Sequence, residues 1–161
     1  MLEIRRYQNT DSSAVWELHH LALGPTGNFF SEGKWDEDLR DIQNHYINND
    51  GEFLVGVLDN KIVCMGAFRK KTATLAEIKR MRVLPFYQRR GFGQIILLKL
   101  EEKASILGYT ELCLDTTTKQ ISAQKLYENN GYIEVGRGHM PPFELIFYHK
   151  NISSKQVNIQ L

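Results

Sequence analysis

Long apolar stretches are missing from this sequence. Ile95–Leu98 is an uninterrupted apolar run, but it is far too short to cross a bilayer. Met1–Arg6 contains no apolar core of the length that a secretory signal needs. We therefore expect a cytoplasmic protein with no membrane partner.

Cysteine is scarce and histidine is poorly placed for metal binding. Cys64 and Cys113 lie in apolar contexts without Cys-x-x-Cys or cysteine–histidine spacing, so buried thiols are expected rather than a disulfide or a metal site. His19, His20 and His45 have no histidine or carboxylate four residues further along a shared helix face. We assign them no chemistry and predict no metal.

An overall excess of charge is also absent. Lysine and arginine number 20 against 19 acidic residues, a net charge of +1 that gives no global reason to expect nucleic acid as a partner. The 42% hydrophobic and 24% charged composition is ordinary for a soluble globular protein. With 161 residues, the chain is expected to form one domain over 1–150, followed by a polar tail over 151–161.

Positive charge is nevertheless concentrated locally, in a window that contains Glu77 as its acidic residue. The basic residues of this window are Arg69, Lys70, Lys71, Lys79, Arg80, Arg82, Arg89 and Arg90. Such a local field suits a small polyanionic ligand, although a solvated charged face is the alternative for residues 69–71. A nucleic-acid surface would need more interleaved aromatic residues than Phe86 and Tyr87.

Hydrophobic periodicity predicts a mixed α/β sheet. Alternation predicts strands over 2–7, 52–58, 61–68, 74–83, 111–115, 132–135 and 143–148. Helical spacing predicts helices from 9–11 to about 23, over 35–47, from 94 to 107, and over 120–131. Gly24–Asn28 is expected to end the first helix, and Gly136–Pro142 to form the loop of the last strand pair.

The predicted strand 74–83 changes its pattern partway along. Apolar residues fall at positions 76 and 78 but then at 81 and 83, so the parity changes near Lys79 and Arg80. A strand can do this only by inserting an extra residue, which is a β-bulge. A bulge here would push the strand away from its next neighbour and leave N–H and C=O groups free to pair with an extended, amide-bearing ligand arm such as pantetheine.

A basic, glycine-containing turn follows that strand and leads directly into a helix. Gly91 and Gly93 let the backbone approach a ligand or take a positive φ, and the first N–H groups of the helix have no intrahelical partner. Together with Arg89 and Arg90 they predict a phosphate site. Because position 96 is Ile96, neither the P-loop pattern nor the third glycine of the dinucleotide fingerprint is present.

Two motifs give a more specific indication. The first is the turn Gln88-Arg89-Arg90-Gly91-Phe92-Gly93, and the second is Ala123-x-x-Leu126-Tyr127-Glu128-Asn129-Asn130-Gly131-Tyr132. In their order and spacing they resemble the pyrophosphate loop and the A-x-x-L/F-Y-E-x-x-G-F/Y signature of the GNAT superfamily of acyl-CoA-dependent N-acetyltransferases. The resemblance covers roughly residues 2–149 and is strongest over 76–135.

This resemblance implies a fold and an activity. The fold would be a twisted, mostly antiparallel sheet with a central parallel strand pair splayed by a β-bulge and with helices on both faces. The activity would be transfer of an acetyl group from acetyl-CoA to a primary amine, by direct attack in a ternary complex. A small amine or a peptide amine would be the acceptor, and a homodimer is an expected assembly.

The same resemblance assigns site residues. Tyr127 would be the general acid at the sulfur of CoA, and Glu77 occupies the strand position where some members keep the base. The cofactor-binding residues would be Met81, Arg82, Val83, Gln88, Arg89, Arg90, Gly91, Phe92, Gly93, Gln120 and Tyr127. The family often has Asn where Gln120 stands, so the contact of that residue with the cofactor arm is an open question.

Alternatives exist for the roles and for the function. Tyr127 could be a core aromatic of an amphipathic helix, and Glu77 could be the partner of Lys79 or of a cation on a neighbouring strand. Rival functions are a protein N-terminal or lysine acetyltransferase and a non-catalytic, acyl-CoA-binding regulatory module.

Overall fold

The computed structural model describes residues 1–23 and 34–153. Within this part of the chain, the strands form one sheet in the order β1-β2-β3-β4-β5-β7-β6. Only the β4–β5 pair is parallel. The strands are β1 (Glu3–Arg6), β2 (Glu52–Leu58), β3 (Lys61–Lys70), β4 (Leu75–Val83), β5 (Glu111–Thr117), β6 (Ile133–Met140) and β7 (Phe143–Asn151). The predicted mixed sheet is confirmed.

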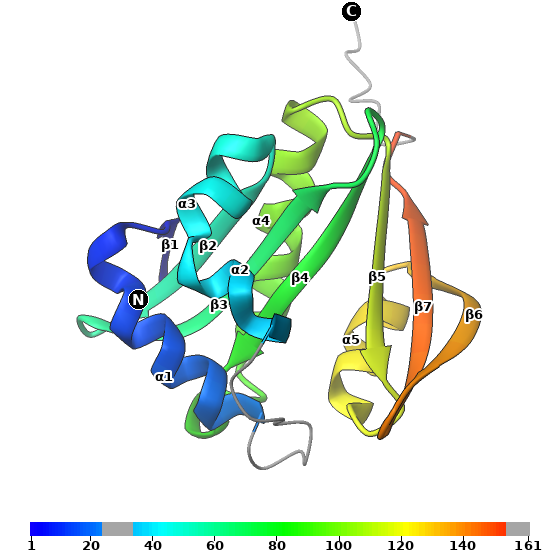
Figure 1. The fold of residues 1–161 in the computed structure, drawn as a ribbon. Helices are drawn as coiled ribbons and strands as arrows, with labels where there is room; N and C mark the ends of the chain where they lie inside the picture. Colours follow the sequence, from blue (N-terminus) through cyan, green and yellow to red (C-terminus); the bar gives the residue numbers. More distant parts are fainter. Residues whose placement is uncertain (24–33, 154–161) are drawn as a thin grey trace, which may run out of the picture.

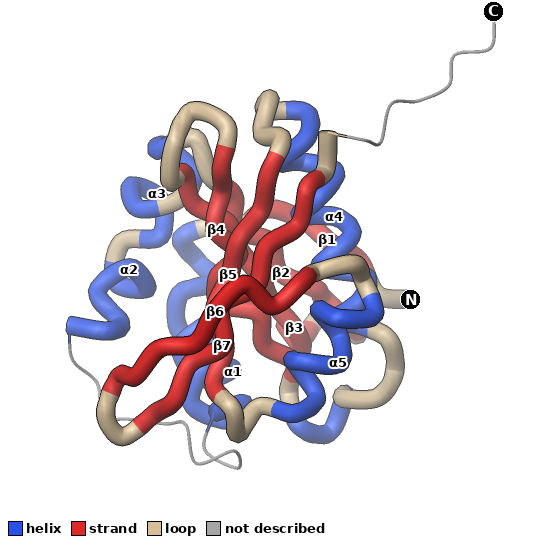
Figure 2. The backbone as a smooth tube through the Cα atoms, turned by 90° about the vertical axis from the view of Figure 1, so that its right-hand side faces the viewer, coloured by secondary structure: helices blue, strands red, loops and turns tan. Residues whose placement is uncertain are grey.

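Helices cover both faces of the sheet (Figures 1 and 2). One face carries α1 (Ser12–Leu23), α2 (Glu37–Arg40) and α3 (Ile42–His45), and the other carries α4 (Phe92–Ile106) and α5 (Ile121–Asn129). Single 3-10 turns are η1 (Asn9–Asp11), η3 (Lys34–Asp36), η4 (Ile47–Asn49) and η5 (Pro85–Tyr87). None of the described helices is long and apolar enough to serve as a membrane span.

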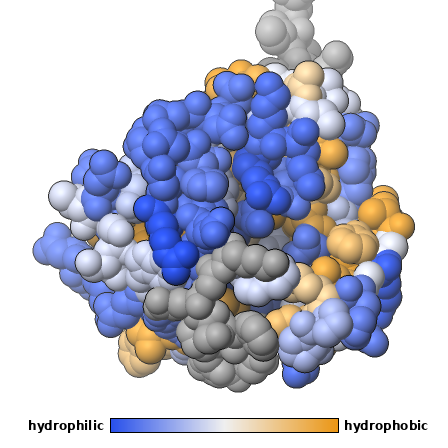
Figure 3. Space-filling view, viewed as in Figure 1, coloured by the Kyte–Doolittle hydropathy of each residue, from blue (hydrophilic) through white to orange (hydrophobic). Residues whose placement is uncertain are grey.

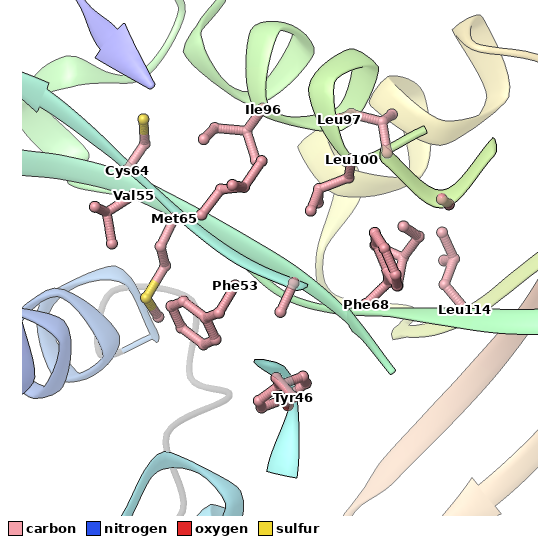
Figure 4. Close-up of a cluster of buried hydrophobic side chains, with 14 of the residues drawn as sticks. Tyr46, Phe53, Val55, Cys64, Met65, Phe68, Ile96, Leu97, Leu100 and Leu114 are labelled. Atoms are coloured by element: carbon pink, nitrogen blue, oxygen red, sulfur yellow. The ribbon is translucent and has the colours of Figure 1, made fainter. Parts of the chain in front are cut away.

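The hydrophobic core lies on both sides of the central strands, because the strands are covered on both faces (Figure 4). Ile96, Leu97 and Leu100 of α4 are fully buried above β3. On the opposite side, Met65 and Phe53 lie toward α1 and toward Tyr46. This double layer explains why β2 and β3 read as nearly continuous apolar runs.

The predicted β-bulge is present in β4. Met65 of β3 pairs with Arg82, whereas Ala67 pairs with Lys79, so two residue steps on β3 face three on β4. Arg80 is the residue that absorbs the extra step, with a φ of 58°. Before the bulge, β4 pairs with β5 over 75–77 and 111–113 only, and beyond these three positions the two strands diverge (Figure 1).

Two predicted elements differ from the structure. The helix expected over 35–47 is a series of short pieces, interrupted at Asp41, whose φ of −147° is not helical and whose side chain instead accepts a hydrogen bond from the backbone N–H of Asn44. The loop expected over Gly136–Pro142 is mostly strand, since β6 continues to Met140. The stop expected at Gly24–Asn28 lies outside the described residues.

The end of the sheet extends slightly past the boundary expected at residue 150. β7 continues through Asn151, and the next residue, Ile152, is buried and donates its backbone N–H to the carbonyl of Thr110 at 2.8 Å. The packed part of the chain therefore reaches Ile152.

Candidate active site

The turn between β4 and α4 has the backbone geometry expected of an anion site. Gly91 is the N-cap of α4, with a φ of 80°, and a Cβ placed on it would meet no atom within 4 Å. Arg89 is also left-handed, with a φ of 64°. Helix geometry leaves the backbone N–H groups of Phe92, Gly93 and Gln94 without intrahelical acceptors, so they are available to an anion.

The side chains of the turn are arranged around this helix start. Arg89 and Arg90 are exposed, and no carboxylate of the described residues lies within ion-pair distance of either. The guanidinium of Arg90 lies 5.1 Å from the ring centroids of both Phe86 and Tyr87, which holds it beside the turn. Gln88 donates from Nε2 to the carbonyl of Val83 at 3.2 Å and so fastens the turn to the end of β4.

Gly93 is half-buried against side chains of α5 and β4. A Cβ on Gly93 would lie 3.4 Å from Leu126 of α5 and 3.8 Å from Val83. These are ordinary contact distances, and Gly93 has no positive φ. Of the two glycines, Gly91 therefore carries the conformational requirement, whereas Gly93 marks where α4, α5 and β4 meet.

The backbone of β4 beyond the bulge is unpaired on its β5 side. Met81, Arg82 and Val83 have partners at most on β3, because the parallel pairing with β5 ends at Glu77. The carbonyl oxygens of Met81 and Val83 accept hydrogen bonds from Arg82 Nη1 and Gln88 Nε2, and within the described residues no strand hydrogen bonds are formed on the β5 side. An extended ligand with amide groups could add to this edge as a short strand.

α5 places Tyr127 beside that gap. The side chain is buried, with ring contacts to Tyr132 at 5.7 Å and to Tyr148 at 6.2 Å between centroids. Burial raises the pKa of Tyr127 to about 12, while Arg82 of β4 lowers it and Asp115 of β5 raises it further. Tyr127 is thus both a core aromatic and a phenol within electrostatic reach of both diverging strands.

Gln120 stands at the N-cap of α5 but makes no capping hydrogen bond. Its side-chain oxygen instead accepts a hydrogen bond from the hydroxyl of Thr116 at 2.7 Å. This contact fixes the amide with its oxygen toward β5, so the Nε2 donor is the group left for a ligand.

One of the two roles expected for Glu77 was to pair with a cation on a neighbouring strand, and the structure shows such a pair. It is buried, faces Arg69 directly across β3–β4, and accepts a hydrogen bond from Arg69 Nε at 2.7 Å. Lys71 lies 3.7 Å away. The carboxylate is nevertheless at the last paired position before the strands diverge, opposite Cys113 of β5.

Asp115 is a carboxylate that the sequence interpretation did not single out. It lies two residues after Cys113 on β5 and therefore on the same face as Glu77, just past the point of divergence. Asp115 is an exposed residue, and partial desolvation together with the nearby charge of Glu77 raises its pKa. Its alternation along β5 was the available signal, but only the divergence of the strands shows that it faces the gap.

A buried polar network lines the α1 side of the same gap. Arg80 donates from Nε to Asp38 at 2.9 Å, and its Nη1 lies 3.4 Å from Asp36. Asp36 also pairs with Nε2 of His19 at 3.1 Å, and Tyr46 donates to Asp38. His19, to which we assigned no chemistry, is a structural member of this network, and burial together with Arg82 and Arg80 lowers its pKa to about 4.

The basic window of the sequence is therefore divided into two groups. Arg69, Lys70, Lys71 and Arg80 are paired with carboxylates, several of them distant in the sequence. Within the described residues, ion-pair partners are absent for Lys79, Arg82, Arg89 and Arg90. The charges that remain unpaired lie at the turn and in the gap.

Comparison with known sequences points to one family. A profile described as the acetyltransferase (GNAT) family matches residues 8–132. N-acetylaspartate synthetase of Xenopus tropicalis is 35% identical over 101 residues, which cover 62% of this chain and 37% of that protein. Human N-acetyltransferase 8 is 30% identical over 132 residues, covering 73% of this chain and 58% of that protein. The chain thus spans less than two thirds of either relative.

Solved structures share the fold over nearly the whole chain. An acetyltransferase of the GNAT family from Staphylococcus aureus Mu50 superposes with a TM-score of 0.86 at 24% identity, covering 94% of this chain and 99% of that one. PaiA N-acetyltransferase from Thermoplasma acidophilum, solved in complex with coenzyme A, gives a TM-score of 0.76 at 18% identity with coverage of 94% and 99%. The overall fold of this chain is therefore a known one.

Proposed function

Because the chain belongs to the acetyltransferase (GNAT) family, we propose that it transfers an acetyl group from acetyl-CoA to a primary amine by direct attack in a ternary complex. Acetyl-CoA supplies an activated acyl carbon and a thiolate leaving group. The residues of this chain supply the binding, the orientation and the proton transfers.

The turn and the β4 edge are suited to hold the co-substrate. The open space at Gly91, the free N–H groups at the start of α4 and the unpaired charges of Arg89 and Arg90 fit a pyrophosphate. The unpaired edge of β4 over Met81–Val83 fits an amide-bearing arm. A backbone N–H of this edge would donate to the oxyanion that develops during attack.

Tyr127 is the proposed general acid. Attack forms a carbon–nitrogen bond and breaks the carbon–sulfur bond, so the departing thiolate needs a proton and the amine must lose one. A phenol with a pKa near 12 remains protonated at neutral pH and so can donate to the sulfur. The side chain is 5% exposed, so the phenol lies in a largely desolvated position.

Glu77 and Asp115 are the carboxylates able to receive the proton of the amine. Glu77 remains our proposed base, acting directly or through water, and its carboxylate already forms an ion pair with Arg69. The raised pKa of Asp115, due to desolvation and to Glu77, makes it the second candidate.

Direct attack is favoured over an acyl-enzyme because the thiol nearest the gap is a poor nucleophile. Burial and the charge of Glu77 raise the pKa of Cys113 to about 11, so it is almost wholly protonated at neutral pH. Cys64 is fully buried, and burial raises its pKa to about 12.

The observation that carries this proposal is the position of Tyr127 beside the gap where β4 and β5 diverge. The test is thiol release from acetyl-CoA across amines, polyamines, amino acids and peptides, with initial rates measured while both substrates vary. Intersecting lines in double-reciprocal plots support a ternary complex, and parallel lines would indicate an acyl-enzyme. Binding of acetyl-CoA with no release for any acceptor would instead favour the regulatory module.

The breadth of the acceptor panel follows from the relatives. N-acetylaspartate synthetase is named for an acetylated amino acid, which places amino acids in the panel beside simple amines. Turnover confined to peptides would instead assign the chain to protein acetylation.

A further inference from the structure

Arg82 is a cation without a carboxylate partner in the described part of the chain. It is half-buried on β4, and its Nε is buried with no hydrogen-bond acceptor. Arg82 Nη1 donates a hydrogen bond to the carbonyl oxygen of Met81 at 2.8 Å. A guanidinium has five N–H donors, so most of the hydrogen-bonding capacity of Arg82 is unused.

The guanidinium of the neighbouring Arg80, by contrast, has several hydrogen-bond acceptors. It contacts both Asp36 and Asp38, and it donates to the carbonyl of Trp35 at 2.6 Å. Because Asp36 is shared with His19 and Asp38 with Tyr46, these carboxylates are already engaged. Neither Asp36 nor Asp38 is therefore available to pair with Arg82.

The environment of Arg82 disfavours an uncompensated charge. Burial and the like charge of Arg80 lower the pKa of Arg82 to about 10. An incoming anion would compensate this charge, which water stabilises poorly at a buried position. His19 nearby also has a buried Nδ1 without a hydrogen-bond partner.

The position of Arg82 connects this unused capacity to the reaction. Its pairing with Met65 puts its side chain on the α1 side of the sheet, the side on which Glu77 and Asp115 lie. Arg82 is also close enough to Tyr127 for each to influence the pKa of the other. In the space-filling view this face is largely hydrophilic (Figure 3), as expected for a polar acceptor approaching from this side.

We propose that Arg82 binds the carboxylate of the acceptor, so that the acceptor is an amino acid or a related small amine with a carboxylate near its amino group. A bidentate contact would occupy the unused donors of Arg82 and direct the amine toward the gap. This inference rests on the proposed acetyl transfer and adds the class of acceptor.

The test compares amino acids with their amides, which keep the amino group but lack the negative charge. The wild type should use the acid at least ten-fold better than the amide, as kcat/KM corrected to the neutral amine. Arg82→Met should reduce kcat/KM for the acid by roughly 10- to 150-fold, the range for hydrogen bonds to charged groups. The amide should lose much less than the acid, so the acid-to-amide ratio of kcat/KM should fall toward one, and Arg82→Lys should restore part of that ratio.

Lys79→Met is the matched control, because Lys79 is another unpaired cation of β4. A similar loss in both variants would indicate a diffuse field and overturn the assignment to Arg82. No preference for acids in the wild type, or a preference for peptides without a free carboxylate, would also overturn it. If Arg82→Met does not fold, the acid-to-amide ratio of Arg82→Lys decides, since an unchanged ratio contradicts a bidentate contact.

The two proposals fail in different ways. Transfer to amines that is indifferent to the carboxylate refutes the role of Arg82 and leaves acetyl transfer intact. Absence of transfer to every acid, amide and peptide refutes the proposed function itself.

Discussion

Tyr127 of α5 and Arg82 of β4 lie close enough, where β4 and β5 separate, for each to influence the pKa of the other. Burial raises the pKa of Tyr127, and the charge of Arg82 opposes that rise. Tyr127 in turn raises the pKa of Arg82. The two residues do so although the helices that flank the sheet lie on opposite faces. The separation of the strands therefore lets a group from the α4–α5 side and a group from the α1 side act on the same space.

Tyr127→Phe should separate catalysis from packing. The ring contacts with Tyr132 and Tyr148 remain, so melting temperature and CoA affinity should stay near those of the wild type. The turnover rate should fall roughly 10²- to 10⁴-fold, as expected for loss of a general acid. Tyr127→Ala should instead destabilise the fold by about 3–5 kcal/mol through the cavity that it leaves. A fully active Tyr127→Phe variant would remove the acid assignment.

The pH profile offers a second check on the same group. Because burial raises the pKa of Tyr127 to about 12, its proton is retained throughout the neutral and mildly alkaline range. The rate should therefore rise as the acceptor amine loses its proton, with no decline attributable to Tyr127 below about pH 11. A reproducible decline near pH 9 in a protein that is still folded would contradict this expectation.

Gly91→Ala should weaken binding of acetyl-CoA, and Gly108→Ala provides a matched comparison. Both glycines have a positive φ, 80° and 96°, with no atom within 4 Å of an added Cβ, so both substitutions impose backbone strain of about 1–2 kcal/mol. Only Gly91 is at the turn. Thermal unfolding should shift similarly in both variants, whereas KM for acetyl-CoA should rise only in Gly91→Ala. Equal KM values would reject the turn as the phosphate site.

Arg89→Ala and Arg90→Ala should act on the phosphates of the co-substrate. Both side chains are exposed, so each loss should be near the low end for a charge-assisted hydrogen bond, roughly ten-fold in affinity for CoA. Binding of a pantetheine thioester without the nucleotide should hardly change, as measured by calorimetry. Equal losses for the two ligands would point to indirect damage to the turn.

Glu77→Gln and Asp115→Asn should identify the base. The variant that removes the base should lose most activity at pH values where the amine is largely protonated, and the other should keep the wild-type profile. If Glu77 serves only as the partner of Arg69, its substitution should lower the melting temperature and leave the pH profile unchanged. A pair of unaltered profiles would exclude both carboxylates.

Much of this arrangement follows from local patterns. The change of parity at Lys79 and Arg80 predicted the bulge, and the bulge is found at Arg80 because a period-two strand has no other means of shifting its apolar face. The turn at Gly91 and the end of α4 at Gly108 were likewise predicted from the local sequence. Both glycines have the positive φ that such positions require.

The charged residues were less predictable because their partners are distant in the sequence. Arg80 lies 42 residues from Asp38, its main partner, so nothing near Arg80 indicates that it is neutralised. A separation of 17 residues likewise conceals that His19 is buried beside Asp36, and nothing near Arg82 in the sequence indicates that its Nε lacks an acceptor. The single helix predicted over residues 35–47 was also wrong. The apolar residues have helical spacing, but Asp41 interrupts the helix.

The short β4–β5 pairing also has a mechanical consequence. The sheet consists of a four-stranded half, β1 to β4, and a three-stranded half, β5, β7 and β6, joined in the sheet over residues 75–77 and 111–113. Any swing of one half against the other would pivot near these residues and change the width of the gap at its far end. Since Tyr127 packs on Tyr148 of β7 while Arg82 belongs to β4, such a swing would alter the separation between the proposed proton donor and the proposed carboxylate anchor.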